Sequence, residues 1–450
     1  MTARVTVVDE LRARIGAAVV TDPAVLQSYR SDRSGAVGDG SPLGVVFAES
    51  TDDVAAVLAI AERTRTPVVT RGAGTGLAGG ASAAAGELVL STERMTGLLE
   101  VSRADRIARV SAGVLSADVD AAAVAVGLRY TPDPGSVAIS TIGGNIATNA
   151  GGLRCVKYGV TRDSVLGLEV VLPGGGILHT GGRTIKGVAG LDLTSLIVGS
   201  EGTLGVVTEA TLRLRSVSPV VHTVVGLFPS TAAAAAGVTE VLEAGDSPLV
   251  AELLDGTCLL ALDRWKGTSF GRGALAMIQF EGNDGAHACD VVARLWARSA
   301  TEVTVADDGG GALVAARRDA LPALERLGRV LIEDVAVPLS QVGTMIERVE
   351  RIATEFGVTI ATMAHAGDGN LHPIIVVDEP GIPDRAWRAA DAVFRAALDL
   401  GGTLTGEHGV GLLKQRWLRS EIGDVSTDLT RGIKSVFDPN GILNPGKALG

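Results

Sequence analysis

The sequence has few cysteines, no long apolar run and no excess of positive charge, and each shortage excludes a class of protein. Cys155, Cys258 and Cys289 lie too far apart to hold one iron–sulfur cluster or zinc ribbon, and so few thiols suit a reducing cytosol. No window reaches the roughly 18 consecutive apolar residues of a transmembrane helix. Charged side chains interrupt residues 1–20, which predicts an amphipathic helix rather than a signal peptide. The net charge of -11 argues against a nucleic-acid-binding surface. We therefore expect a cytoplasmic protein, with peripheral attachment to a membrane as the alternative.

Glycine, in contrast, is abundant. It accounts for 59 of the 450 residues, about 13 per cent against an average of about 7. The glycines follow no collagen-like period, so they serve turns and places where another group approaches the backbone closely. The length predicts two or three domains with ample hydrophobic core.

The first glycine cluster, residues 71–80, follows a predicted strand–helix–strand unit over residues 44–70. It contains the dinucleotide-binding spacing Gly-x-Gly-x-x-Gly at Gly74, Gly76 and Gly79. The context differs from a Rossmann fold, because the pattern follows the second strand of its unit and no long helix follows it. Clustered backbone N–H groups in such a loop can still bind a pyrophosphate. A merely flexible loop is the alternative.

Two further glycine clusters cover residues 132–152 and 199–208. Three such clusters predict a large flat ligand that lies against backbone at several points, because side chains beyond Cβ would collide with it. A flavin dinucleotide fits this description better than a mononucleotide held by one loop.

After Pro219 strands alternate with amphipathic helices, which predicts an α+β domain whose antiparallel sheet is covered by helices on one face. Within it, the segment from His365 to His372 lies between two apolar runs and predicts a β-hairpin that brings both histidines together. Two imidazoles and a carboxylate form a common catalytic metal site, with Glu407 as the third ligand and His408 beside it as a base. The alternative is that the histidines only cap a polar turn.

Together these motifs resemble the flavin-dependent D-2-hydroxyacid dehydrogenases of the vanillyl-alcohol-oxidase/PCMH superfamily. That group includes D-lactate dehydrogenases, the D subunit of glycolate oxidase and D-2-hydroxyglutarate dehydrogenase. The resemblance covers nearly the whole chain. It implies a helical segment over residues 1–40, a PCMH-type FAD-binding domain of two α+β subdomains over 41–218, and a substrate domain over 219–450. The C-terminal tail of the last domain would return to the FAD-binding domain.

The resemblance also implies which residues bind FAD, and it implies noncovalent attachment, because the first glycine loop has no histidine. The residues implied are Arg71, Gly72, Ala73, Gly74, Thr75, Gly76, Leu77, Gly79, Gly80, Pro132, Asp133, Ser136, Gly143, Asn145, Thr148, Gly152, Glu201, Gly205, Val206 and Asn444.

By the same resemblance, the two hairpin histidines and Glu407 would bind a divalent metal, zinc or manganese. His408 would be the catalytic base, and Arg317 would bind the substrate carboxylate, with the adjacent Arg318 as the alternative.

The expected reaction is oxidation of a D-2-hydroxyacid to the 2-oxoacid, with hydride transfer to flavin N5. The lysine and threonine that hold the distal carboxylate in hydroxyglutarate enzymes would correspond to Ile332 and Leu321. D-lactate or glycolate is therefore favoured over D-2-hydroxyglutarate or another longer acid. The alternatives are a metal-free alcohol or sugar oxidase of the same superfamily, a metal-dependent hydrolase and a non-catalytic nucleotide-binding subunit.

Electrons would pass to an acceptor outside the chain, because no iron–sulfur motif is present. Oxygen, a quinone, a cytochrome, an electron-transfer flavoprotein or a separate cluster subunit would each serve. The oligomeric state stays open, with a homodimer as one option.

Overall fold

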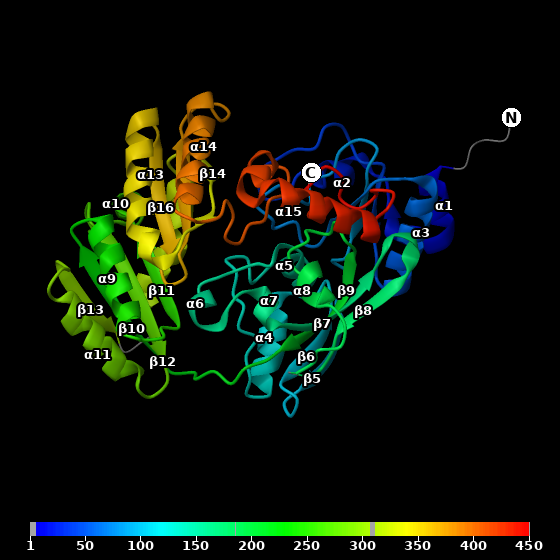
Figure 1. Cartoon of the computed structure of the whole chain (residues 1–450). Coiled ribbons are helices and arrows are strands. Elements are labelled where there is room, and N and C mark those ends of the chain that lie inside the picture. The colour runs from blue at the N-terminus through cyan, green and yellow to red at the C-terminus, as the bar shows by residue number, and fades with distance from the viewer. Residues whose placement is uncertain (1–5, 185, 307–310, 450) are drawn as a thin grey trace. The chain divides into compact units, whose positions relative to one another are not determined.

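The computed structural model describes residues 6–184, 186–306 and 311–449, and the chain divides into two compact units (Figure 1). The first unit contains Met1–Gly151, Gly159–Ser216 and Glu407–Gly450, and the second contains Gly152–Tyr158 and Val217–Gly406. The last part of the chain therefore belongs to the same unit as the N-terminal half. Across the described ranges, no helix combines the length and apolar character that crossing a membrane requires.

The first unit contains two sheets. The strands of the four-stranded sheet, in the order β1-β2-β4-β3, are β1 (Val19–Val20), β2 (Gly44–Phe47), β4 (Leu88–Ser91) and β3 (Val68–Arg71). β4 pairs in parallel with both β2 and β3. α3 (Thr51–Thr64) connects β2 to β3 and begins after Ser50, whose hydroxyl accepts a hydrogen bond from the Asp53 N–H (3.2 Å). The predicted strand–helix–strand unit is therefore confirmed.

The second sheet of this unit is antiparallel. Its strands, in the order β5-β6-β9-β7-β8, are β5 (Leu98–Ser102), β6 (Ile107–Ser111), β9 (Val206–Arg213), β7 (Val165–Val171) and β8 (Ile177–Gly181). The other helices of the unit are α1 (Val7–Ile15), α2 (Pro23–Ser28), α4 (Ser116–Ala125), α5 (Ile142–Thr148), α7 (Thr161–Ser164), α8 (Leu193–Ile197) and α15 (Gln415–Phe437).

The second unit is built on one eight-stranded antiparallel sheet. Along the order β13-β10-β12-β11-β16-β17-β14, with β15 also paired to β17, its strands are β13 (Glu302–Ala306), β10 (Val221–Phe228), β12 (Ala274–Glu281), β11 (Val250–Leu254), β16 (Thr359–His365), β17 (Asn370–Val377), β14 (Arg329–Ile332) and β15 (Val335–Ala336). Its helices are α6 (Cys155–Tyr158), α9 (Thr231–Glu243), α10 (Gly256–Lys266), α11 (Gly285–Trp296), α12 (Gly311–Glu325), α13 (Val342–Phe356) and α14 (Asp384–Asp399).

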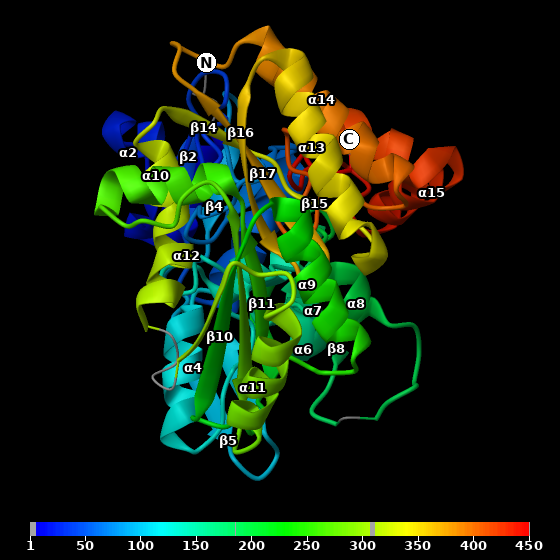
Figure 2. The ribbon, with the colours of Figure 1, turned by 90° about the vertical axis from the view of Figure 1, so that its left-hand side faces the viewer.

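Helices cover both faces of this sheet, and the prediction that they lie on one face is wrong. Figure 2 shows α9, α11 and α13 on one side of the strands and α10 and α12 on the other. The helices on the second side, α10 and α12, place Leu259 and Leu324 in the same buried cluster as Leu254 and Met363 of the sheet. The strands account for this result, because β11 and most of β12 are buried at successive positions, as in sheets that are covered on both faces.

The strand pairing along residues 329–336 is interrupted. β14 pairs Ile332 with Ile374, and β15 resumes the pairing with Val335 opposite Leu371. Pro373 lies opposite the interruption and has no N–H to donate, although its carbonyl accepts a hydrogen bond from the Glu333 N–H (3.0 Å). The break places the next side chain, that of Asp334, in the buried interior, with 0% exposure.

Candidate active site

The two histidines predicted to form a hairpin lie together on β16 and β17. Met363 is paired with His372, and His365 is paired with Asn370 at the end of the ladder. The connecting turn closes at Gly369, whose φ of 84° is in the left-handed region that glycine adopts without strain. The two imidazole centroids are 5.2 Å apart with an interplanar angle of 88°, and both side chains are buried. The predicted hairpin is therefore confirmed, and it presents two imidazoles to one position.

Glu252 is a buried carboxylate beside this pair that we did not predict. It lies on β11, is 1% exposed and has a different partner at each oxygen. Its Oε1 is 2.5 Å from His365 Nδ1, and its Oε2 accepts a hydrogen bond from Arg317 Nε (2.5 Å). Burial raises the pKa of Glu252, but the neighbouring His365 and Arg317 outweigh burial, so the net effect lowers the pKa below its ordinary value. The carboxylate is therefore held in its charged form.

Arg317, rather than Arg318, points into this cluster. The Arg317 side chain is 13% exposed, and its Nη1 lies 3.6 Å from the sulfur of Met363 on β16. Arg318 is exposed. Of the two neighbouring arginines, only Arg317 has its guanidinium beside the histidine hairpin.

A second buried carboxylate, Asp334, lies on the His372 side. Its Oδ1 is 3.9 Å from His372 Nδ1, and its Oδ2 accepts a hydrogen bond from the Thr405 hydroxyl (2.8 Å). Each imidazole of the hairpin therefore has a buried carboxylate near its Nδ1 atom. This arrangement is typical of metal-binding histidines, whose second nitrogen is oriented by an acidic group.

The chain passes this cluster just before it enters the first unit. Gly406 is the last residue of the second unit, and a Cβ added there would lie 2.5–2.8 Å from the side-chain amide of Asn370. Glu407 is the next residue and belongs to the first unit, where a Cβ added at Gly151 would lie 2.6 Å from its Oε2 atom. His408 Nε2 is 3.7 Å from Glu407 Oε1. Glu407 therefore lies against Gly151 of the second glycine cluster (residues 132–152), within its own unit.

The first glycine loop, Gly72–Gly80, is an irregular segment with no helix behind it, as predicted. The carbonyls of Gly74 and Gly76 accept hydrogen bonds from the N–H groups of Arg33 and Ser34 (3.1 Å each). Among the residues that the structure describes, none accepts a hydrogen bond from the backbone N–H groups of Gly72–Gly80. A row of free amides on a half-buried loop is a suitable site for a phosphate anion.

The side chain of Arg71 supports this loop from within the protein. Its Nη1 donates hydrogen bonds to the carbonyls of Ser31 (2.8 Å) and Ala81 (3.2 Å), and its guanidinium lies over the ring of Tyr29 (4.8 Å). Burial lowers the pKa of Arg71. These contacts assign the guanidinium to the protein itself, so Arg71 shapes the loop.

The other predicted glycine clusters meet the first one inside this unit. A Cβ added at Gly72 would lie 2.3 Å from the hydroxyl of Thr141, which caps α5. A Cβ added at Gly80 would lie 3.3 Å from Glu201 Oε2. The three clusters are therefore brought together, as a ligand that contacts all of them requires.

Glu201 connects these clusters to the segment that follows Glu407. Its two carboxylate oxygens accept hydrogen bonds from the N–H groups of Val410 (2.7 Å) and Gly411 (2.9 Å). Burial raises the pKa of Glu201, and these two hydrogen bonds oppose that shift. Its φ of 52° lies in the left-handed region, which is uncommon for a residue with a side chain. Glu201 thus holds Val410 and Gly411 against the glycine loops.

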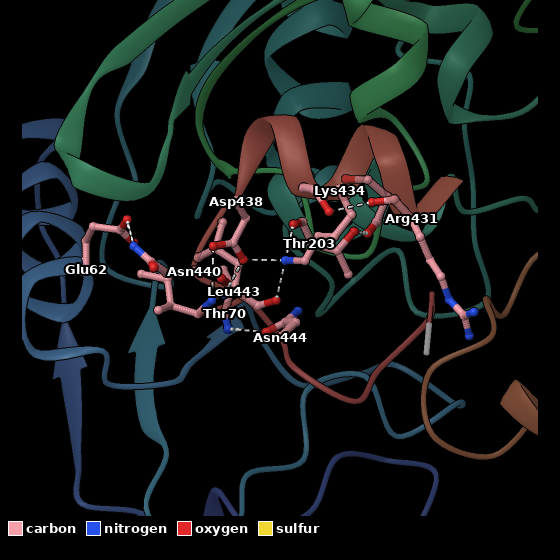
Figure 3. A network of polar contacts seen from close by, with 12 residues as sticks. Glu62, Thr70, Thr203, Arg431, Lys434, Asp438, Asn440, Leu443 and Asn444 are labelled. Atoms are coloured by element: carbon pink, nitrogen blue, oxygen red, sulfur yellow. Dashed lines mark hydrogen bonds and ion pairs between the residues drawn. The ribbon is translucent and has the colours of Figure 1, made fainter. Parts of the chain in front are cut away.

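Residues of the C-terminal tail contact the loop that carries Glu201 (Figure 3). Lys434 Nζ donates hydrogen bonds to the carbonyls of Thr203 (2.7 Å) and Leu443 (2.9 Å) and forms an ion pair with Asp438. Burial lowers the pKa of Lys434, and the ion pair opposes that shift. The tail is thereby attached to the loop that carries Glu201.

Asn444 completes this attachment with both ends of its amide. Its Oδ1 accepts a hydrogen bond from the Thr70 N–H (2.9 Å), and its Nδ2 donates one to the carbonyl of Glu201 (2.6 Å). The side chain therefore bridges the end of β3, where the first glycine loop begins, and the Glu201 turn.

The remaining residues predicted to contact FAD differ in what their side chains can offer. Asn145 Nδ2 donates a hydrogen bond to Ser116 Oγ (2.7 Å) in the interior, and Val206 is 1% exposed in the hydrophobic core. Gly152 belongs to the second unit. The others are buried or half-buried residues of the first unit, namely Ala73, Thr75, Leu77, Gly79, Pro132, Asp133, Ser136, Gly143, Thr148 and Gly205.

Comparison with known proteins agrees with this organisation. Residues 42–181 match the family described as FAD binding domain, and residues 218–448 match the family of FAD linked oxidases, C-terminal domain. The chain is 40% identical over 417 residues to the glycolate oxidase subunit GlcD of Bacillus subtilis, a match that covers 90% of this chain and 88% of that protein. It is 32% identical over 454 residues to a D-lactate dehydrogenase of Anaerostipes hadrus, with 95% and 94% covered.

Solved structures show the same fold at low sequence identity. p-Cresol methylhydroxylase superposes with a TM-score of 0.80 at 16% identity, over 98% of this chain and 96% of that one. The 4-ethylphenol oxidase of Gulosibacter chungangensis gives 0.80 at 18% identity, with the same coverage. The expected fold class and the resemblance stated from the sequence are confirmed. The chain belongs to the family of FAD-linked oxidases, as an FAD-dependent oxidoreductase with a PCMH-type FAD-binding domain followed by the family's C-terminal domain.

Proposed function

We propose that the protein oxidises a short D-2-hydroxyacid, D-lactate or glycolate, to the corresponding 2-oxoacid with the help of a divalent metal. The observation that carries this proposal is the cluster of His365, His372, Glu252 and Arg317, which combines two metal-binding groups and a cation inside one buried region. The proposal is supported by relatives named glycolate oxidase subunit GlcD and D-lactate dehydrogenase.

The residues present fit FAD. The backbone N–H groups of Gly72–Gly80, which donate to no described residue, suit its pyrophosphate. Without a histidine in this loop the attachment is noncovalent. When bound, FAD supplies the acceptor for the hydride that leaves the substrate α-carbon.

The residues also fit a divalent metal such as zinc or manganese. Ligand atoms of His365 and His372 lie within 4.8 Å of one another, as two ligands of one ion would. Glu407 directly follows Gly406 in the chain, and Gly406 packs against the side-chain amide of Asn370, so Glu407 is the residue that we propose as the third ligand. A bound metal lowers the pKa of a hydroxyl group that coordinates it.

The protein's own groups would then bind the substrate and remove its proton. Glu252 accepts the hydrogen bond from Arg317 Nε, so the Nη groups of the guanidinium would bind the substrate carboxylate. This contact would orient the carboxylate and neutralise its charge. His408, beside Glu407, would accept the hydroxyl proton at its imidazole, since neutral imidazole is abundant near pH 7.

The surroundings favour a substrate with one carboxylate. Ile332 and Leu321, at the positions where hydroxyglutarate enzymes would carry a lysine and a threonine, pack against the hydrophobic cluster of the second unit. Neither side chain can bind a distal carboxylate. D-lactate or glycolate is therefore preferred to D-2-hydroxyglutarate.

The test is a panel of D- and L-lactate, glycolate, malate and 2-hydroxyglutarate with an artificial electron acceptor, before and after treatment with a chelator. We expect activity on D-lactate or glycolate, loss with the chelator and recovery with zinc or manganese. Activity that survives complete removal of metal would refute the metal-assisted mechanism. A preference for 2-hydroxyglutarate would refute the assignment of substrate.

The role of His408 has a separate test. General acid–base catalysis contributes about 10²–10⁴-fold, so His408→Ala should slow reduction of bound FAD by substrate by about that factor in stopped-flow measurements. Flavin content should stay normal in this variant. Flavin reduction at the wild-type rate would remove His408 from the role of base.

A further inference from the structure

Glu252 is a charged residue at a buried position of the sheet, where ionised side chains are unfavourable. It lies on β11, all of whose residues are buried, between β12 and β16 near the middle of the sheet. An unpaired carboxylate at such a place is strongly unfavourable, so its partners must satisfy it fully. Those partners are His365 and Arg317, which are 113 and 65 residues away in the sequence.

The two contacts together determine where the protons lie. Guanidinium groups only donate, so Glu252 Oε2 accepts from Arg317 Nε. A charged carboxylate also only accepts, so the 2.5 Å contact of Oε1 requires a proton on His365 Nδ1. In neutral imidazole the other nitrogen, Nε2, then carries the lone pair. A metal ligand needs that lone pair.

We propose that Glu252 is a positioning residue that orients His365 and Arg317 at once and holds His365 in the tautomer that can bind a metal through Nε2. One rigid carboxylate thereby sets the orientation of a metal ligand and of the cation that binds the substrate. The metal and the substrate in this inference rest on the proposed function, whereas the tautomer does not.

The decisive variant is Glu252→Gln, which keeps the size of the side chain and reverses one hydrogen bond. The glutamine carbonyl must face the Arg317 Nε–H, so its NH₂ group faces His365 Nδ1 and donates to it. His365 must then carry its proton on Nε2, and its ligand lone pair is lost. Glu281→Gln is the matched control, because Glu281 is also on the sheet of this unit but pairs with Lys157 (2.6 Å).

Two measurements are made on the full-length protein. The first determines the tautomer of His365 in ¹⁵N-histidine-labelled, metal-free protein at alkaline pH, with His365→Gln used to assign the signal. We expect Nδ1–H in the wild type and in Glu281→Gln, and Nε2–H in Glu252→Gln. The second measures zinc and manganese affinity. We expect a loss of about 10–100-fold in Glu252→Gln alone, as for other groups that orient metal ligands.

Each outcome decides the inference. An Nε2–H tautomer in the wild type would overturn it even if Glu252→Gln failed to fold. An unchanged tautomer in Glu252→Gln, or equal loss of metal in Glu281→Gln, would also overturn it. If the wild type bound no metal, the proposed function would fail, and the tautomer measurement would still decide the role of Glu252.

Discussion

Replacing Asn444 tests whether the C-terminal tail builds the FAD site by holding two loops together. In Asn444→Ala, the buried carbonyl of Glu201 loses its donor, which costs about 1.5 kcal/mol. The Thr70 N–H is half-buried and water can replace part of its lost bond, so this costs about 0.5 kcal/mol. Asn444 also has a φ of 42°, which alanine tolerates less well by about 1 kcal/mol. The expected destabilisation is therefore about 3 kcal/mol, a large part of an ordinary protein's stability.

The assay is urea unfolding of the first unit, followed by the fluorescence of Trp417. The other tryptophans of the chain, Trp265, Trp296 and Trp387, all belong to the second unit and can be replaced with phenylalanine to isolate the signal. The control is Asn440→Ala, an exposed position four residues earlier whose side chain donates a hydrogen bond to Glu62 at the surface, so its effect should stay within about 0.5 kcal/mol.

FAD affinity distinguishes two roles for Asn444. If it positions the loops, Asn444→Ala should lose both stability and FAD affinity, the latter by about tenfold for each 1.4 kcal/mol that reaches the binding site. A loss of FAD affinity without a loss of stability would instead indicate direct contact with the cofactor. Stability equal to that of Asn440→Ala would refute the reasoning from the hydrogen bonds.

Two further predictions concern the second unit. Arg317→Lys should raise the KM for the hydroxyacid at least tenfold, because lysine cannot form the bidentate contact, whereas Arg318→Lys at the exposed neighbour should change KM less than about twofold; equal effects in steady-state kinetics would contradict the assignment. Burial raises the pKa of Asp255 from 3.8 to about 6, although hydrogen bonds from the Cys258 and Thr362 N–H groups oppose this shift. The protonated Asp255 side chain therefore contributes fully to the stability of the fold below about pH 3.8, and this contribution is lost as the pH rises through about 6. Between pH 4.5 and 7.5 the wild type should therefore lose about 2 kcal/mol of unfolding free energy that Asp255→Asn does not lose, and parallel pH profiles in urea titrations would refute this.

Elements that depend on local sequence were predictable. The hairpin from His365 to His372 followed from the apolar runs on either side of it, and amphipathic helices such as α13 followed from an apolar stripe. Both signals lie within one short window of the chain. The start of α10 has a weaker local signal, because a capping residue beside a buried strand, here Asp255, is less distinctive than a long apolar stripe.

The buried carboxylates that contact the site's histidines were not predictable, for a different reason. Glu252 interrupts an apolar run, which marks it as unusual, but its partners are far away in the sequence and one chain does not say which they are. Asp334 was not predicted as part of the site, since its contact with His372 depends on the break between β14 and β15. Contacts that form only in the tertiary structure leave no periodic pattern in the sequence.

The cost of this buried cluster is itself an argument for function. Each charge removed from water carries a penalty of several kcal/mol, and apolar replacements of buried ion pairs are often neutral or stabilising. Glu252 and Arg317 interrupt a hydrophobic cluster that would pack well without them. Stability therefore does not account for them. Preorganisation does, because groups that must act on a ligand at fixed positions have to be held there before the ligand arrives. If this reasoning holds, replacing Glu252 and Arg317 together by apolar residues of similar size should leave stability equal or higher while abolishing activity, and a marked loss of stability would show that the cluster serves the fold.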